Sequence, residues 1–249
     1  MDFPACPGSP DDTETVWTAI GPARYTEFSY PAATSDDTAA TGTTGGDVVL
    51  NGYLQSFLFF EDDARDEVLS SFRFRDDVQE EADAFLLPYV EAGTVTVGVH
   101  IRGGDRDECT ACVIATDNFF EKSMDFMLRR INMDDGVDVY DDDEREKKSV
   151  TFVVATDSKR DRVGAMNRTD VIFTEKEDPF VDMAILAGCQ HMIITVGTYG
   201  WWAAWLGPHQ REGGMVIYQG DNLHWEWISD ITRPEEMYPP TWIPVNETN

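Results

Sequence analysis

The sequence predicts an α/β fold built on a doubly wound, mostly parallel sheet, and two runs of residues carry this prediction. Val95, Val97, Val99 and Ile101 alternate with more polar residues, which is the two-residue period of a strand. Residues 150–155, Val-Thr-Phe-Val-Val-Ala, are nearly all apolar, as in a strand buried on both faces. Helical patterns separate such strands along the chain, and this alternation indicates parallel pairing.

The elements of the first half follow from local composition and periodicity. Residues 1–47 are rich in Pro, Gly, Ser, Thr, Ala and Asp, and we expect this low-complexity segment to be mostly disordered. The folded α/β domain is expected over 48–249. Acidic helices are expected over 62–72 and 76–87, then the strand from Thr94, then a helix that starts at its N-cap Asp117 and carries the apolar stripe Phe120, Met124, Met127 and Ile131.

The second half continues the alternation after a charged connector over 134–148. Asp178 and Pro179 are typical of a helix start, with the aspartate as N-cap and the proline at the first helical position. The remaining elements are short strands at 171–173, 191–196 and 215–218, the last of them closing the sheet, with helices ending at Ala187 and over 201–206.

The net charge of -28 argues against two classes of partner. Nucleic acid and anionic membrane surfaces would both be repelled, so we expect neither. No run approaches the roughly 18 apolar residues of a membrane span, and residues 1–10 lack the basic and apolar regions of a signal peptide. Two Asn-x-Thr triplets, at Asn167 and Asn246, are candidates for glycosylation.

Four cysteines are present, and two of them form Cys109-x-x-Cys112. This spacing fits a redox pair, half of a zinc site or a short disulfide. Zinc needs about four ligands, and no second Cys or Cys/His pair has suitable spacing, so no metal is expected. Because the pair follows a Gly-Gly turn and does not open a helix, a loop disulfide or two free thiols is the favoured interpretation.

Polar or glycine-rich residues follow three of the predicted strands. His100 and Arg102 end the first, Thr156 and Asp157 end the second, and residues 197–200, Gly-Thr-Tyr-Gly, end another. Carboxyl ends of parallel strands meet at one edge of the sheet, where ligands bind in doubly wound folds. An arginine fork and close-approaching glycines suit a phosphorylated ligand. The alternative is that the first strand lies at the sheet edge with its polar face in water.

These runs resemble the signatures of the α-1,2-fucosyltransferases. Residues 97–105, Val-Gly-Val-His-Ile-Arg-Gly-Gly-Asp, resemble the first signature, His-x-Arg-Arg-Gly-Asp, with Gly103 in place of its second arginine. Residues 152–157 resemble the second signature, and the stretch from Asp182 to Leu206 is similar to the third. Landmarks at 51–56 and 238–243 extend the resemblance over roughly 48–245.

The resemblance implies the Rossmann-like, donor-binding half of a GT-B glycosyltransferase. Members transfer L-fucose from GDP-β-L-fucose to the 2-hydroxyl of a terminal galactose on a glycan, with inversion and without a required metal or cofactor. Animal members are Golgi membrane proteins, anchored near the N-terminus, with a luminal catalytic region. The family's N-terminal half, with its Gly-Asn-Gln landmark, has no counterpart before residue 48.

The resemblance and the strand-end pattern together indicate donor-binding residues. Arg102 would bind the diphosphate, the alternative being a surface arginine paired with Asp105. His100 would contact the donor or orient Arg102, the alternative being a packed structural histidine. Asp105 would hold the turn or Arg102, and no catalytic base is assigned. Thr156 and Asp157 are candidates for ribose or guanine, with capping of their strand as the alternative. The remaining candidates are Thr198, Tyr199 and Gly200 for phosphate, and Asp182, whose alternative is a carboxylate favoured by the helix dipole in a first turn.

Two other functions stay open at the level of the sequence. A degenerate or truncated GDP-sugar-binding domain without activity is one, and Gly103 favours it because one guanidinium is lost. A Cys-x-x-Cys redox protein is the other, although nothing else in the sequence supports it. Trp201, Trp202 and Trp205 are expected in the core and not as a platform for sugar.

Overall fold

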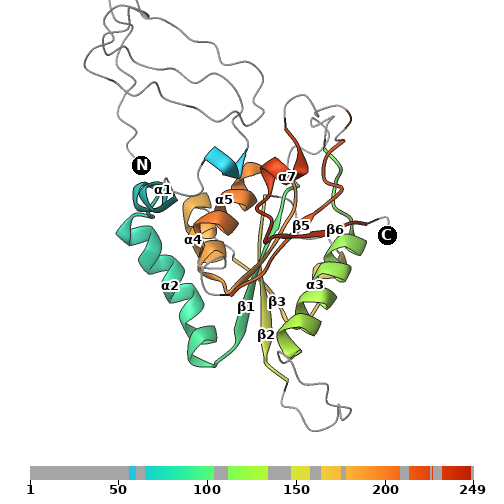
Figure 1. Ribbon diagram of the computed structural model, residues 1–249. Coiled ribbons are helices and arrows are strands. Elements are labelled where there is room, and N and C mark those ends of the chain that lie inside the picture. The colour runs from blue at the N-terminus through green and yellow to red at the C-terminus, as the bar shows by residue number, and fades with distance from the viewer. Residues whose placement is uncertain are drawn as a thin grey trace, which may run out of the picture.

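The computed structural model describes residues 56–59, 65–103, 112–133, 147–157, 164–174, 178–207, 213–224, 226 and 232–247. Within these ranges it is a single sheet with helices on both faces (Figure 1). The predicted low-complexity segment 1–47 lies outside the described residues. The strands are β1 (Val95–Ile101), β2 (Val150–Thr156), β3 (Val171–Phe173), β4 (His191–Ile194), β5 (Val216–Gln219) and β6 (Ile243–Val245).

The helices match most of the sequence-based expectations and extend two of them. The helix predicted over 76–87 continues to Glu91, and the one predicted from Trp201 begins at Thr198. The helices are η1 (Phe57–Phe59), α1 (Arg65–Ser71), α2 (Asp76–Glu91), α3 (Asp117–Asn132), η5 (Gly164–Met166), α4 (Pro179–Gly188), α5 (Thr198–Leu206) and α7 (Pro234–Met237).

The sheet has the order β3-β2-β1-β4-β5-β6, and every pair is parallel. The predicted doubly wound α/β fold is therefore confirmed. Residues 215–218 were expected as the last strand, and this is wrong, because β6 adds a further strand beside β5. The sequence pattern missed β6 because Ile243-Pro244-Val245 is short and contains proline, which is tolerated only at a sheet edge or a strand end.

Strand β1 lies in the middle of the sheet, paired with β2 on one side and β4 on the other. The alternative interpretation of an edge strand with one face in water is therefore wrong. His100 is only 7% exposed although it is polar, because α5 covers the face that carries it. Parallel sheets are buried on both faces, so alternation here does not mark one wet face.

Helices cover the two faces unequally (Figure 1). Helix α3 packs on one face through its predicted stripe, Phe120, Met124, Met127 and Ile131, all of which are buried. Helices α4 and α5 cover the other face, and α2 packs outside α4. Asp178 caps α4 as predicted, since its carboxylate accepts a bond from the Phe180 N–H at 2.8 Å.

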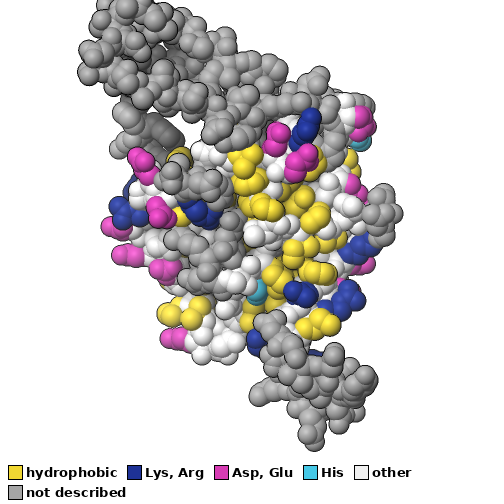
Figure 2. All heavy atoms as spheres, in the orientation of Figure 1, with side chains coloured by type: hydrophobic (Ala, Val, Ile, Leu, Met, Phe, Trp, Pro, Cys, Tyr) yellow, Lys and Arg dark blue, Asp and Glu magenta, His cyan; other side chains and the backbone are white. Residues whose placement is uncertain are grey.

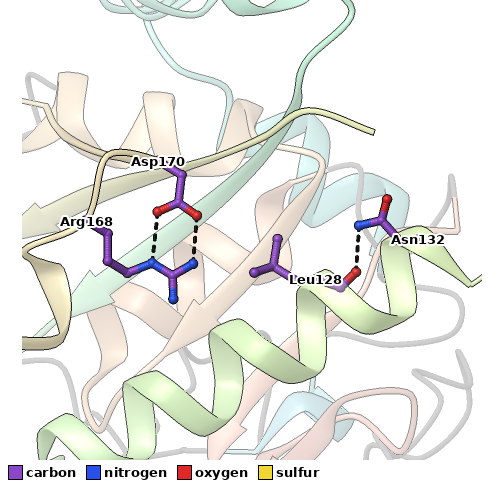
Figure 3. Close-up of polar contacts among 4 residues, drawn as sticks. All are labelled: Leu128, Asn132, Arg168 and Asp170. Carbon is purple, nitrogen blue, oxygen red and sulfur yellow. Dashed lines mark hydrogen bonds and ion pairs between the residues drawn. The ribbon is translucent and has the colours of Figure 1, made fainter. Parts of the chain in front are cut away.

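Figure 3 shows two polar contacts, one within the last turn of α3 and one just before β3. The Asn132 side-chain amide donates to the Leu128 carbonyl at the end of α3, and its Oδ1 accepts from the Lys148 N–H before β2. Arg168 and Asp170 form a two-bond ion pair at 2.8 and 2.7 Å just before β3. Because both groups are satisfied by each other and lie before a strand, this arginine belongs to the sheet edge opposite the carboxyl ends.

Candidate functional site

The candidate site lies where the strand order reverses. The chain runs outward from β1 to β2 and β3, then returns through α4 to β4 on the other side of β1. Ligands of doubly wound sheets bind outside the carboxyl ends of the strands at this switch point. His100 and Arg102 end β1, and Gly197 to Gly200 follow β4. The structure therefore brings together the residues that the sequence placed at these two strand ends.

Two hydrogen bonds fix the backbone at the end of β1. The Arg102 N–H donates to the Thr195 hydroxyl at 3.0 Å, and the Gly103 N–H donates to the Asp157 carboxylate at 2.6 Å. Asp157, expected to bind ribose or guanine or else to cap its strand, therefore joins the ends of β2 and β1. Its side chain is exposed, so the carboxylate also borders the open edge of the sheet.

The Arg102 side chain passes over Gly197. A Cβ atom on Gly197 would lie 3.2 Å from Arg102 Nη1 and 3.3 Å from Arg102 Cδ. Gly197 also has φ +123°, a conformation that L side chains rarely adopt. Both features require glycine, and the lack of a side chain at this turn lets the Arg102 guanidinium lie across the start of α5.

His100 is buried against the first turn of α5. A Cβ atom on Gly200 would lie 2.5 Å from His100 Nδ1, and the Tyr199 ring is 5.1 Å from the imidazole centroid. Burial lowers the pKa of His100 to about 4; Asp157 opposes this effect and Arg102 adds to it. The imidazole is therefore neutral at physiological pH. Its Nδ1 is buried and has no hydrogen-bond partner in the described part of the chain.

The contact between His100 and Gly200 predicts that Gly200→Ala destabilises the wild type but stabilises a His100→Ala variant. We expect Gly200→Ala to lower the free energy of unfolding by about 1–2 kcal/mol, because overpacking exceeds the gain from a better helix former. In a His100→Ala background the same change should stabilise by up to about 1 kcal/mol. Urea unfolding of the four proteins measures both effects. Equal effects in the two backgrounds would show that the histidine is not what Gly200 accommodates.

Helix starts α3 and α5 both lie near the switch point, and they differ in how their first amides are satisfied. At α3, the Glu247 carboxylate accepts bonds from the Thr116 N–H at 2.8 Å and from the Thr116 hydroxyl at 2.7 Å. The sequence placed the cap at Asp117, which is wrong, because Thr116 occupies it and a distant glutamate supplies the acceptor. At α5, Gly197 gives no side-chain cap and Thr198 is exposed. Among the described residues, a carboxylate therefore already lies at the start of α3, whereas no side chain caps the start of α5.

We expect Glu247→Gln to lower the free energy of unfolding by about 1 kcal/mol, because it removes a negative charge from the start of α3. Chemical unfolding measures the loss, and added salt should reduce it. Glu80→Gln is the matched control, since Glu80 is exposed on α2. Equal, negligible effects of the two changes would mean that Glu247 does not cap α3.

The other predicted residues fall in different places. Thr156 is half-buried at the end of β2, and Asp182 is half-buried in the first turn of α4. Tyr199 donates its hydroxyl proton to the Pro179 carbonyl, which joins α5 to the start of α4. Burial and then the Asp182 and Asp178 carboxylates raise the pKa of Tyr199, so the phenol stays protonated. Asp105 lies outside the described residues.

The tryptophans of α5 belong mainly to the core, as expected. Trp205 is fully buried, Trp201 is 6% exposed and donates its indole proton to the Met237 carbonyl at 2.8 Å. Trp202 is half-buried and stacks on Phe72. The two inner rings thus hold α5 in place and leave no face for a sugar.

The cysteines show a disulfide where the sequence left two alternatives open. Cys112 is disulfide-bonded, with its partner outside the described residues, so it is not a free thiol. Cys189 is free and buried, and burial raises the pKa of its thiol to about 12. Among the described residues no three His, Cys, Asp or Glu side chains gather as metal ligands would.

The two glycosylation candidates have different surroundings. Asn167 is exposed in the turn before β3, and Thr169 beside it is exposed too. Asn246 is half-buried, with its side-chain oxygen against the Gly220 backbone. Its backbone carbonyl accepts a bond from Lys122 at 3.4 Å. Modification of either asparagine remains a prediction.

Thr195 was not singled out from the sequence as a site residue. It is 2% exposed, and its hydroxyl bonds to both Arg102 and the His100 carbonyl. A threonine after three apolar strand residues is a weak signal, because threonine is common in strands. Only the pairing of β1 with β4 shows that its hydroxyl meets Arg102.

Comparison with known proteins identifies the family of this chain. The model of Glycosyl transferase family 11 matches residues 40–245. The chain belongs to this family. Two relatives are galactoside alpha-(1,2)-fucosyltransferase 2 of Rattus norvegicus and galactoside 2-alpha-L-fucosyltransferase Sec1 of Mus musculus, each 31% identical over 210 and 207 residues, respectively. These matches cover 79% of this chain and 53% and 51% of the relatives, so the family 11 chain spans about half the length of the curated relatives it matches.

Two solved structures share features with this family 11 chain. The NodZ alpha-1,6-fucosyltransferase soaked with GDP-fucose is 16% identical, with a TM-score of 0.41, covering 68% of this chain and 55% of that one. The fucosyltransferase NodZ from Bradyrhizobium is 18% identical, with a TM-score of 0.38, covering 59% of this chain and 48% of that one. The fold assignment follows from the strand order and not from these likenesses. Among the described helices, none is both long and apolar enough to cross a bilayer.

Proposed function

We propose that this chain forms the donor-binding half of a galactoside 2-alpha-L-fucosyltransferase. The reaction transfers L-fucose from GDP-β-L-fucose to the 2-hydroxyl of a terminal galactose on a glycan, with inversion. The supporting observation is the position of Arg102, held by Thr195 and lying over Gly197 at the uncapped start of α5. Family membership and the names of the relatives support the same reaction class.

The geometry supports a specific role for Arg102 and α5 in this proposal. The galactose oxygen attacks the anomeric carbon of fucose while the bond to the diphosphate breaks, and GDP leaves with the electron pair. Negative charge therefore grows on the diphosphate in the transition state. A guanidinium and the N–H groups of Thr198, Tyr199 and Gly200 at a helix N-terminus stabilise such charge. No metal or cofactor is required in the proposal, and the base that accepts the hydroxyl proton remains unassigned.

The remaining donor contacts are proposed from the same edge of the sheet. Thr156 and the exposed Asp157 face the ribose or guanine, because carboxylates accept paired donors from both groups. Neutral His100 lies buried close to Arg102 and adds no second charge there, and the Asp182 carboxylate helps keep the Tyr199 phenol protonated. By family we also propose a Golgi membrane location, with this part of the protein on the luminal side.

A second function has one observation in its favour. Gly103 stands where the family signature has a second arginine, and its N–H donates to Asp157 at 2.6 Å. Gly103 thus joins the ends of β1 and β2 through its N–H and supplies no positive charge there. One cation fewer beside the diphosphate fits a GDP-sugar-binding domain that does not catalyse transfer.

Calorimetric titration of the full chain with GDP and GDP-fucose tests the proposal, with UDP as the control for the base. Saturable binding of GDP that exceeds binding of UDP is expected. A folded chain that binds no GDP would refute both functions. Incubation with GDP-fucose and a β-galactoside, followed by mass spectrometry of the glycan, then separates the two: a fucosylated product supports the enzyme, and binding without product supports the binding domain.

A further inference from the structure

Thr195 occupies an unusual position at the point where β1 and β4 part. The backbone pairing of these strands ends at His100 and Ile194. One residue later, the Thr195 N–H and hydroxyl both donate to the His100 carbonyl at 3.3 Å, and the hydroxyl accepts the Arg102 N–H at 3.0 Å. The hydroxyl thus adds a bridge between the strands where the backbone ladder has stopped.

The same segment also touches the other end of Arg102. A Cβ atom on Gly197, two residues after Thr195, would lie 3.2 Å from Arg102 Nη1, so only glycine lets the side chain pass this closely. The end of β4 therefore holds the Arg102 backbone through a hydroxyl and supports its side chain through a glycine. Since Thr195 is 2% exposed, it cannot itself contact a ligand.

We infer that Thr195 is a positioning residue that aims the Arg102 guanidinium at the diphosphate of the donor. This inference rests on the proposed function, because it assumes that Arg102 binds the diphosphate. Without the hydroxyl, the Arg102 N–H loses this acceptor and the strand end is held less firmly. Small displacements of a charged group at a binding site have large effects on the interactions it makes. Binding of the diphosphate should suffer, while contacts to the nucleoside should not.

The test compares Thr195→Val, which keeps the shape and removes the hydroxyl, with Thr195→Ser, which keeps the hydroxyl. GDP and GMP are titrated into each full-length variant, and thermal unfolding reports whether it is folded. We expect Thr195→Val to weaken GDP binding about tenfold and to change GMP binding by less than about twofold. Thr195→Ser should bind GDP like the wild type. Thr174→Val is the matched control, since Thr174 is 5% exposed just after β3 and away from the switch point.

The outcomes separate this inference from the proposed function. If the wild type binds GDP and Thr195→Val binds it equally well, Thr195 has no positioning role while the donor site stands. Equal losses for GDP and GMP, or no rescue by Thr195→Ser, would show a general structural role and overturn the inference. Should Thr195→Val fail to fold, Thr195→Ser against Thr195→Ala gives the same comparison. Failure of the wild type to bind GDP would refute the proposed function and the inference with it.

In an Arg102→Ala background the hydroxyl should no longer matter. We expect Thr195→Val to leave the ratio of GDP to GMP affinity unchanged there, because the group that it positions is gone. A further loss of GDP affinity in the double variant would mean that Thr195 acts through another residue, and would overturn the inference.

Discussion

Arg102→Ala is expected to weaken GDP binding by about a hundredfold, roughly 3 kcal/mol. Arg102 is half-buried, its backbone is fixed by Thr195, and its side chain lies over the start of α5. A guanidinium in such a position is already ordered before the ligand binds, so little conformational entropy is lost on binding. Its removal leaves the α5 amides as the only part of this anion site that the structure describes.

The protein's net charge of -28 increases the importance of this single cation. The field of the whole molecule repels a diphosphate, and only a local positive group offsets that repulsion. Calorimetry with GDP measures the loss, and Arg75→Ala is the control. Arg75 is exposed and pairs with Asp77 at 2.8 Å, so its removal should leave GDP affinity within about twofold. Equal GDP affinities for wild type and Arg102→Ala would show that the diphosphate does not bind at Arg102.

Acidic side chains lie on the outer helices and also border the candidate site. Figure 2 shows them over α1 and α2, which contribute Asp66, Glu67, Asp76 and Asp77 to their first turns, and near α7. The exposed Asp157 carboxylate lies at the carboxyl edge of the sheet itself. Arg102 and the start of α5 therefore have to offset acidic charge at the site as well as the field of the whole molecule.

Protonation of His100 is expected to cost about 3 kcal/mol of stability between pH 6.5 and pH 4. Each pKa unit corresponds to about 1.4 kcal/mol, and burial lowers the folded-state pKa from 6.5 to about 4. Between pH 6.5 and pH 4, His100 is protonated in the unfolded chain but stays neutral in the folded chain. Stability therefore falls as the pH decreases through this window, and it is unaffected by His100 above it.

Urea unfolding of wild type and His100→Gln over this pH range measures the effect as a difference. The difference is needed because the chain carries 47 acidic residues, and because burial lowers the pKa of His191 as well. Wild-type stability should fall by about 3 kcal/mol more than that of the variant. Parallel curves would mean that His100 is not held neutral in the folded protein.

The sequence predicted most of the fold because periodicity and end signals are local properties. The run 94–101 gives β1, the stripe from Phe120 to Ile131 gives the buried face of α3, and Asp178 with Pro179 gives the start of α4. Alternation of strands and helices then gave the doubly wound class. The candidate site followed from the same reasoning, since parallel strands must bring His100, Arg102 and Gly197 to one edge.

Other features depended on contacts between distant segments. Glu247 caps α3 from 131 residues away, and β6 forms only because β5 offers an open edge. His100 reads as polar in the sequence but is buried, because α5 lies on it and Gly200 makes room for its ring. No local sequence pattern predicts which helix will cover a given strand.

The sequence by itself determined the elements, the class of sheet and the strand ends that carry the chemistry, because these follow from the order of residues along a few turns or strands. The tertiary structure alone decided that β1 is central, that Glu247 lies at the start of α3 while no described side chain caps α5, and that Thr195 holds Arg102. These facts arise from packing between segments nearly a hundred residues apart, and pairing at that distance is fixed only when the whole core forms.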